Sequence, residues 1–157
     1  MPTKKTDSLF TESTDVPVSK SIGEILALLV RAGATSINQE LEGGKVTGLS
    51  FVIPMGAGRI PYKLPVRVDP VFAKLNGRRD VWGKFGQRGM AAKDREQAER
   101  VAWRQLYWWL KSQLALIDLG MVQAGEVLMP YMLDREGRTF YEVHGPKLLE
   151  APKGESA

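Results

Sequence analysis

Basic and aromatic side chains gather in one stretch of the sequence, residues 76–93. This stretch holds five Lys and Arg residues and one acid, so it carries +4, which equals the formal net charge of the whole 157-residue chain. Cations pair with phosphate groups, and aromatic rings among them stack on unpaired bases. These residue types therefore favour the binding of single-stranded nucleic acid, with candidate contacts at Arg78, Arg79, Trp82, Lys84, Phe85 and Arg88.

A second set of candidates follows on the long helix predicted over residues 94–119. Arg100, Arg104 and Trp108 are successive four-residue steps, which places them on one row of a helix. Lys111 lies next to the same rings. We interpret this row as a stacking platform with phosphate clamps that continues from the basic stretch.

The other aromatic residues of this helix have two interpretations. Aromatic side chains at helical spacing are more often part of a core than of a binding surface, which favours burial of Trp103 and Tyr107. In the alternative, both rings belong to the platform. Trp109 lies on the apolar stripe of the helix, and we predict that it is a core residue.

A protein-binding role competes with nucleic-acid binding. Trp, Tyr and Arg side chains are also enriched at the hot spots of protein interfaces. The alternative hypothesis is a protein-binding module, either an inhibitor of a host enzyme or an assembly or structural subunit, anchored by Trp103, Tyr107 and Trp108. A homo-oligomer would use the same face. Salt separates the hypotheses, because phosphate binding weakens steeply with salt and an apolar interface hardly changes.

The residue types that most enzymes need are scarce. The chain contains no Cys and a single His, His144, so a cysteine nucleophile and a Cys- or His-rich metal site have no residues to build on. No glycine-rich loop ends in Gly-Lys-Ser or Gly-Lys-Thr, which excludes the common phosphate-binding loop. We expect a non-enzymatic protein without a cofactor or a metal.

The composition, 43% hydrophobic and 25% charged, is that of an ordinary folded domain. We predict one α+β domain over residues 19–144, with 76–93 as a basic loop and flexible tails at 1–18 and 145–157. The stretch 114–129 is too short and too polar to span a bilayer. We therefore expect a cytoplasmic protein without a membrane partner.

The elements of the first half follow from turn and cap signals. A helix is predicted to start at Ser21, with Ser21 and Glu24 as a capping box and Gly33 at its C-terminus. Alternating apolar residues then predict three antiparallel strands, with a two-glycine hairpin at 42–45. The third strand, 60–68, contains two prolines and should lie at an edge of the sheet.

The second half is predicted to be mostly helical. Asp69 is placed as the N-cap of a short helix over 70–75, and helices follow at 94–119 and about 124–131. Residues 138–143 are predicted to add a final strand. The fold class is α+β, a three-stranded antiparallel meander packed by an N-terminal helix and a long C-terminal helix.

Several segments together resemble a family of small uncharacterised proteins from bacteriophages and prophages. They are residues 96–106, 109–118, 121–122 and 126–132 of the helical half, and Pro-Tyr-Lys-Leu-Pro-Val at 61–66 after the meander. The resemblance spans about residues 20–142. It implies a phage setting, in the host cytoplasm, and favours both DNA-metabolism and host-takeover roles without implying a particular activity. Given the basic and aromatic residues as well, we expect an accessory protein of phage replication or recombination.

Overall fold

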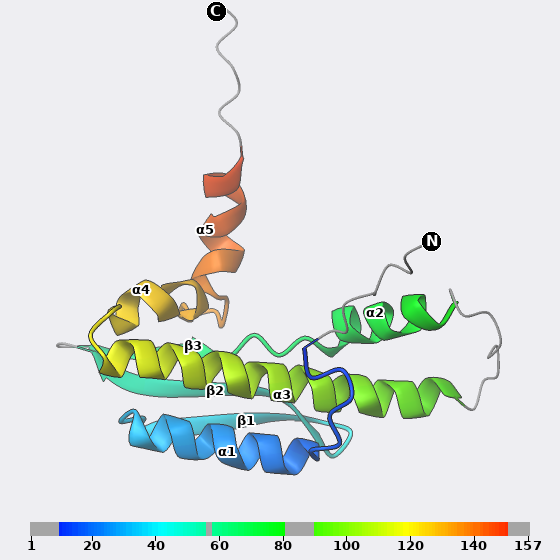
Figure 1. Ribbon diagram of the computed structural model, residues 1–157. Helices are drawn as coiled ribbons and strands as arrows, with labels where there is room; N and C mark the ends of the chain where they lie inside the picture. The colour runs from blue at the N-terminus through cyan, green and yellow to red at the C-terminus, as the bar shows by residue number, and fades with distance from the viewer. Residues whose placement is uncertain (1–9, 56–57, 81–89, 151–157) are drawn as a thin grey trace, which may run out of the picture. The chain divides into compact units, whose positions relative to one another are not determined.

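Three antiparallel strands in the order β1-β2-β3 form the sheet of this protein (Figure 1). The computed structural model describes residues 10–55, 58–80 and 90–150, without the side chains of 55, 76–80 and 90–93. The strands are β1 (Ser36–Glu42), β2 (Lys45–Met55) and β3 (Gly58–Lys63). Together with five α-helices in the described residues they make an α+β fold with an N-terminal helix and a long helix after the meander, as predicted.

The helices are α1 (Val18–Arg31), α2 (Val68–Asp80), α3 (Met90–Asp118), α4 (Ala124–Leu128) and α5 (Phe140–Leu149), and a 3₁₀ turn at Met129–Tyr131 follows α4. The chain divides into two compact units. The first comprises Met1–Leu28 and Val66–Ser112, and the second comprises Leu29–Pro65 and Gln113–Ala157. The predicted organisation as one domain over 19–144 stays a prediction.

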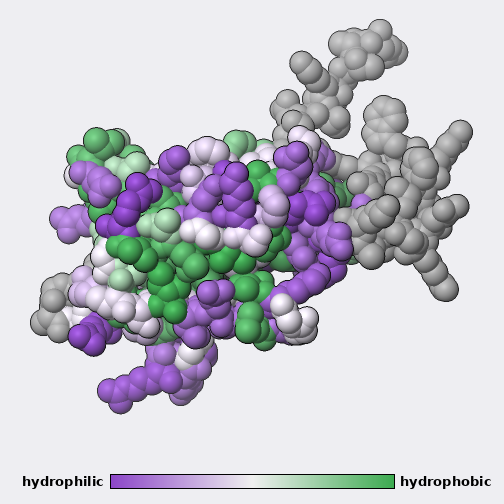
Figure 2. Space-filling model, turned by 90° about the horizontal axis from the view of Figure 1, so that it is seen from below, coloured by the Kyte–Doolittle hydropathy of each residue, from purple (hydrophilic) through white to green (hydrophobic). Residues whose placement is uncertain are grey.

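Both units contain buried apolar residues. In the first unit they include Ile25 of α1 and Trp103 and Leu110 of α3, all at most 2% exposed. In the second unit they include Leu49 and Phe51 of β2 and Tyr62 of β3. Some apolar side chains remain at the surface, where hydrophobic and hydrophilic residues mix on the face shown in Figure 2. Every second residue of β2 from Leu49 to Ile53 is buried, which confirms the alternation predicted for this strand.

The register of the sheet agrees with the predicted hairpin and edge. Glu42 pairs with Lys45 across two glycines with positive φ angles, which is the backbone that a two-residue hairpin requires. Phe51 and Tyr62 are opposite each other on β2 and β3, and their rings stack with centroids 5.5 Å apart. β3 lies at the edge of the sheet, as its prolines predicted, but it ends at Lys63 rather than 68. Pro65 has no N–H to continue the ladder.

The predicted start of the first helix is wrong. α1 begins three residues earlier, at Val18, and the carbonyl of Pro17 accepts bonds from the N–H groups of Lys20 and Ser21. Ser21 therefore lies inside the helix, where its hydroxyl cannot cap, and the Ser21–Glu24 capping box does not form. The predicted C-terminus is confirmed, because Gly33 has a φ of +94°, a left-handed conformation that favours glycine.

The boundaries of the basic loop also differ from the prediction. α2 runs from Val68 to Asp80 and α3 begins at Met90, so both ends of the stretch 76–93 are helical. α2 continues past the predicted end at 75 because no proline follows Pro70 and because one glycine inside a helix costs only about 1 kcal/mol. Since α2 begins at Val68, Asp69 lies inside its first turn and is not its N-cap. The middle of the stretch, 81–89, lies outside the described residues.

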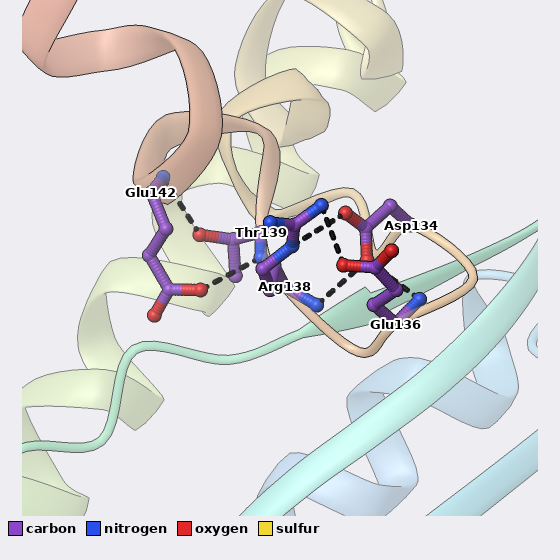
Figure 3. Close-up of polar contacts among 5 residues, drawn as sticks. All are labelled: Asp134, Glu136, Arg138, Thr139 and Glu142. Atoms are coloured by element: carbon purple, nitrogen blue, oxygen red, sulfur yellow. Dashed lines mark hydrogen bonds and ion pairs between the residues drawn. The ribbon is translucent and has the colours of Figure 1, made fainter.

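The C-terminal strand predicted at 138–143 is instead the start of α5. Thr139 is its N-cap: its side chain accepts a bond from the N–H of Glu142, and the Glu142 carboxylate accepts one from the N–H of Thr139, a capping box (Figure 3). This pair satisfies two N–H groups that a helix start leaves open. The helix continues to Leu149, so residues 145–149 are not a flexible tail.

A short turn with two acids and two arginines, residues 134–138, leads into this cap. The Asp134 carboxylate accepts bonds from the main-chain N–H groups of Glu136 and Arg138, each at 2.9 Å. The Arg138 guanidinium lies 3.0 Å from Asp134 and 2.8 Å from the Glu136 carboxylate (Figure 3). These hydrogen bonds, led by that of the Arg138 N–H, hold the pKa of Asp134 below its usual range.

Candidate nucleic-acid interface

Trp108 presents a partly open aromatic ring on α3, and cations lie beside it. Its side chain is 38% exposed. The Lys111 Nζ lies 5.2 Å from the centre of its ring and the Arg104 guanidinium 5.5 Å. Tyr107 packs edge-on against it, with centroids 5.1 Å apart. The structure thus brings together three of the four site residues that the sequence placed on this helix.

Arg104 is the most enclosed of these cations. Its Nη1 lies 2.6 Å from the Glu24 carboxylate and 3.5 Å from the Ser21 hydroxyl, both on α1, and its guanidinium lies 4.2 Å from the centre of the Tyr107 ring. The Arg104 side chain is only 13% exposed. Glu24 offsets its charge, so Arg104 is better placed to hold the rings than to bind a phosphate.

Lys111 has a more open position. It is exposed at the surface of α3, and its Nζ is 3.4 Å from the Tyr107 hydroxyl. A hydrogen bond from the ammonium to that oxygen keeps the cation next to Trp108 without removing it from solvent. The Lys111 ammonium is therefore open to an anion from solvent.

Arg100, the fourth site residue, is held by a neighbour on its own helix. Its Nε and Nη2 donate to the Gln97 side-chain oxygen at 2.9 and 2.7 Å. The side chain is half-buried. It lies one helical turn before Arg104, and the row that the four-residue spacing predicted is present.

Burial separates the four predicted aromatic positions of α3. Trp103 is 2% exposed and Tyr107 9%, which confirms the interpretation of both as core residues. Trp109, predicted to be core, is only half-buried. Neighbouring residues of the predicted apolar stripe are buried, including Val101, Leu106 and Leu110, so Trp109 lies at the margin of the covered face.

The N-terminal residues 10–16 contact α3, although 1–18 was predicted to be a flexible tail. The Gln97 amide nitrogen donates to the carbonyls of Glu12 and Thr14 at 3.0 and 2.9 Å, and the Gln105 side chain donates to the carbonyl of Phe10. Sequence reasoning missed both glutamines. No local signal could have revealed them, since their partners are more than 80 residues away in the chain.

Arg95 was also missed. Its guanidinium lies 2.8 Å from the Asp69 carboxylate and 5.7 Å from the centre of the Phe72 ring, both on α2. Arg95 therefore ties the first turn of α2 to the start of α3, and it uses the carboxylate that the sequence suggested as a cap. These two helices flank the basic stretch.

The remaining predicted contacts fall where side chains are outside the described residues. Arg78 and Arg79 belong to the last turn of α2 by their backbone, and Trp82, Lys84, Phe85 and Arg88 lie in 81–89. Their part in the site stays a prediction.

Other chemistry finds no support in the described part of the chain. It contains no group of three or more His, Asp or Glu residues arranged to hold a metal ion. Burial raises the pKa of the Tyr62 hydroxyl, but this residue is a core member of the sheet. None of the described helices combines the length and the apolar character needed to cross a bilayer.

Comparison with known proteins found no matching family model, curated protein or solved structure.

Proposed function

We propose that the first unit binds single-stranded nucleic acid, with single-stranded DNA favoured, as a non-enzymatic accessory protein of phage replication or recombination. The observation that carries the proposal is the partly exposed Trp108 ring, with the Lys111 ammonium 5.2 Å and the Arg104 guanidinium 5.5 Å from its centre. An open ring beside cations is the arrangement with which proteins stack a base and hold the adjoining phosphate. The phage setting and the host cytoplasm rest on the resemblance in sequence.

The described residues take different roles in this proposal. Trp108 stacks on a base, which contributes about 1–3 kcal/mol per engaged base. Lys111 and Arg100 bind phosphates, while Arg104, paired with Glu24, fixes the rings. Further phosphate and stacking contacts come from the basic stretch, at Arg78, Arg79, Trp82, Lys84, Phe85 and Arg88. Because stacking and phosphate contacts do not read base edges, we expect little sequence preference.

A protein-binding module is the second candidate. Its expected anchor was a surface of Trp103, Tyr107 and Trp108, and the first two are buried. One partly exposed tryptophan is a small anchor, since hot spots of protein interfaces cluster in well-packed centres. The burial of these two rings therefore ranks nucleic-acid binding first.

The test is tryptophan fluorescence during titration with oligo-dT at about 50 and about 200 mM salt. We expect quenching and an affinity that falls steeply between the two salt concentrations. Trp108→Phe should reduce the quenching, and Lys111→Gln should weaken binding. Lys147→Gln removes an exposed lysine from α5 in the second unit and is the matched control, which should bind as the wild type does. No quenching at either salt would reject the proposal in favour of the protein-binding module.

A further inference from the structure

The side-chain amide of Gln97 joins two parts of the first unit that are far apart in sequence. Its nitrogen donates to the carbonyls of Glu12 and Thr14, and its oxygen accepts from Nε and Nη2 of Arg100. All four distances are between 2.7 and 3.0 Å. Carbonyls only accept and a guanidinium only donates, so these partners leave one orientation of the amide.

Two of the five N–H groups of the Arg100 guanidinium are directed at Gln97. The edge formed by Nη1 and Nη2 is not the one that faces Gln97, and it can donate two parallel N–H bonds to phosphate oxygens. An arginine held by a neighbour loses less side-chain freedom when it binds than one that moves freely. Gln97 therefore prepares Arg100 for an anion.

The contact by which Gln97 orients Arg100 depends on residues 10–16, which we call the N-terminal segment. Without the two carbonyls, the Gln97 amide has no partner to fix its nitrogen and can rotate away from Arg100. The segment begins in a tight turn: Thr11 has a φ of +63°, and its carbonyl accepts a bond from the Thr14 N–H at 3.0 Å. A non-glycine residue in this left-handed conformation is uncommon. A substitution that forbids a positive φ at Thr11 should therefore disrupt the turn.

We infer that Gln97 is a positioning residue that couples the docking of the N-terminal segment to the orientation of Arg100, which, given the proposed function, raises affinity for a phosphate backbone. Docking and binding then favour each other, because coupling between two sites is reciprocal. Ordering one long side chain in advance corresponds to about a twofold to tenfold change in affinity.

The experiment uses a pair of substitutions at Thr11, whose carbonyl accepts a bond from Thr14 within the segment, and the residues of α3 stay unchanged. Thr11→Pro forbids the positive φ and should undock the segment, whereas Thr11→Gly accepts that φ and is the matched control. The glycine should cost little, because the Thr11 hydroxyl is buried and makes no hydrogen bond within the described residues. Three properties are measured: amide hydrogen exchange of residues 10–16, the NMR signal of the Arg100 Nε–H, and the affinity for oligo-dT.

For Thr11→Pro we expect faster exchange in the segment, a shifted and more rapidly exchanging Arg100 Nε–H, and about a twofold to tenfold weaker binding. Thr11→Gly should leave all three as in the wild type. The inference is overturned if the segment is released while the Arg100 signal does not change. Another outcome is that the wild type binds no oligo-dT while Thr11→Pro still changes the Arg100 signal. That outcome would support the role of Gln97 in orienting Arg100 and would reject the proposed function.

A second pair of variants tests the coupling from the side of the helix. Gln97→Met keeps the length of the side chain and removes its polar atoms, so it should loosen both the segment and Arg100. Gln105→Met removes only the bond to the Phe10 carbonyl and should leave the Arg100 Nε–H unchanged. Equal effects of the two variants on Arg100, with amide exchange of residues 12–14 still slow in Gln105→Met, would mean that the Gln97 amide is not what orients this side chain.

Discussion

The guanidinium of Arg104 lies 2.6 Å from the carboxylate of Glu24, which is 80 residues earlier in the chain. The ion pair joins α3 to α1 and holds the cation 4.2 Å from the Tyr107 ring. Both side chains are largely sheltered from solvent, at 13% and 31% exposed. Arg104, which the sequence suggested as a phosphate ligand, is thus a structural tie of the first unit.

Removing this tie should destabilise the protein. Glu24→Gln leaves the partly buried Arg104 without an opposite charge, and we expect a loss of about 1–2 kcal/mol in the free energy of unfolding, between the values for exposed and buried pairs. Urea denaturation measures it. Glu96→Gln, an exposed acid on α3, is the control and should change stability by less than about 0.5 kcal/mol. Equal losses for the two variants would show that the ion pair adds nothing.

Replacing Trp103 by alanine should destabilise the protein much more than replacing Trp108, because only Trp103 is buried. Trp103→Ala removes a side chain that is 2% exposed and should cost about 3–5 kcal/mol. Trp108→Ala should cost about 1 kcal/mol, because its ring is 38% exposed. Thermal and urea unfolding of both variants give the comparison. If Trp108→Ala is as destabilising as Trp103→Ala, Trp108 is a core residue and its role as a stacking platform is wrong.

Lys111 should contribute to the salt dependence of binding as well as to its strength. Each phosphate contact on a single strand adds about 0.7 to the slope of log affinity against log salt. We expect Lys111→Gln to reduce that slope by about 0.7, measured by oligo-dT titration at several salt concentrations. A weaker affinity with an unchanged slope would show that Lys111 acts through the position of Trp108 and not on a phosphate.

The capping box of α5 should have a measurable local effect. Thr139→Ala removes the acceptor for the Glu142 N–H, and loss of such a cap costs about 1 kcal/mol. Amide hydrogen exchange in the first turn of α5 should become faster, while the exchange of β2 stays as in the wild type. Thr139→Ser keeps the hydroxyl and is the matched control. An unchanged first turn in Thr139→Ala would mean that other contacts hold the start of the helix.

The turn before α5 should weaken in acid. The N–H groups of Arg138 and Glu136, with the Arg138 side chain, hold the pKa of Asp134 below its unfolded value. This carboxylate therefore stabilises the folded state fully above the unfolded pKa, near 4, and the stabilisation is lost as pH falls through the lower folded pKa. NMR titration of the Asp134 carboxyl should give a lower pKa in the native protein than in urea, and Arg138→Ala should reduce the difference. Equal values in the two states would contradict the hydrogen-bonded turn.

Local signals in the sequence determined those elements whose geometry depends on neighbouring residues. Two glycines at 43 and 44 specify a hairpin because their positive φ angles are easy for glycine, and Gly33 ends α1 for the same reason. Alternation on β2 predicted which of its side chains are buried. The α+β class followed from the order of these elements, and the row of Arg100, Arg104 and Trp108 followed from the period of a helix.

Where two local signals competed, the sequence did not decide. Residues 138–143 were predicted to form a strand, yet Thr139 and Glu142 form a capping box that starts α5. The Ser21–Glu24 pair has the same spacing and forms no box, because α1 begins at Val18. The same motif was thus present twice and acted as a cap once.

The tertiary structure alone decided what each site residue contacts. Helical spacing fixes which side chains share a face, but the face that is covered depends on elements distant in the chain, so Trp103 is buried and Trp108 is open. Glu24 and the carbonyls of Glu12 and Thr14 reach α3 only after folding. Contacts between segments 80 or more residues apart arise from packing and leave no periodic pattern in the sequence.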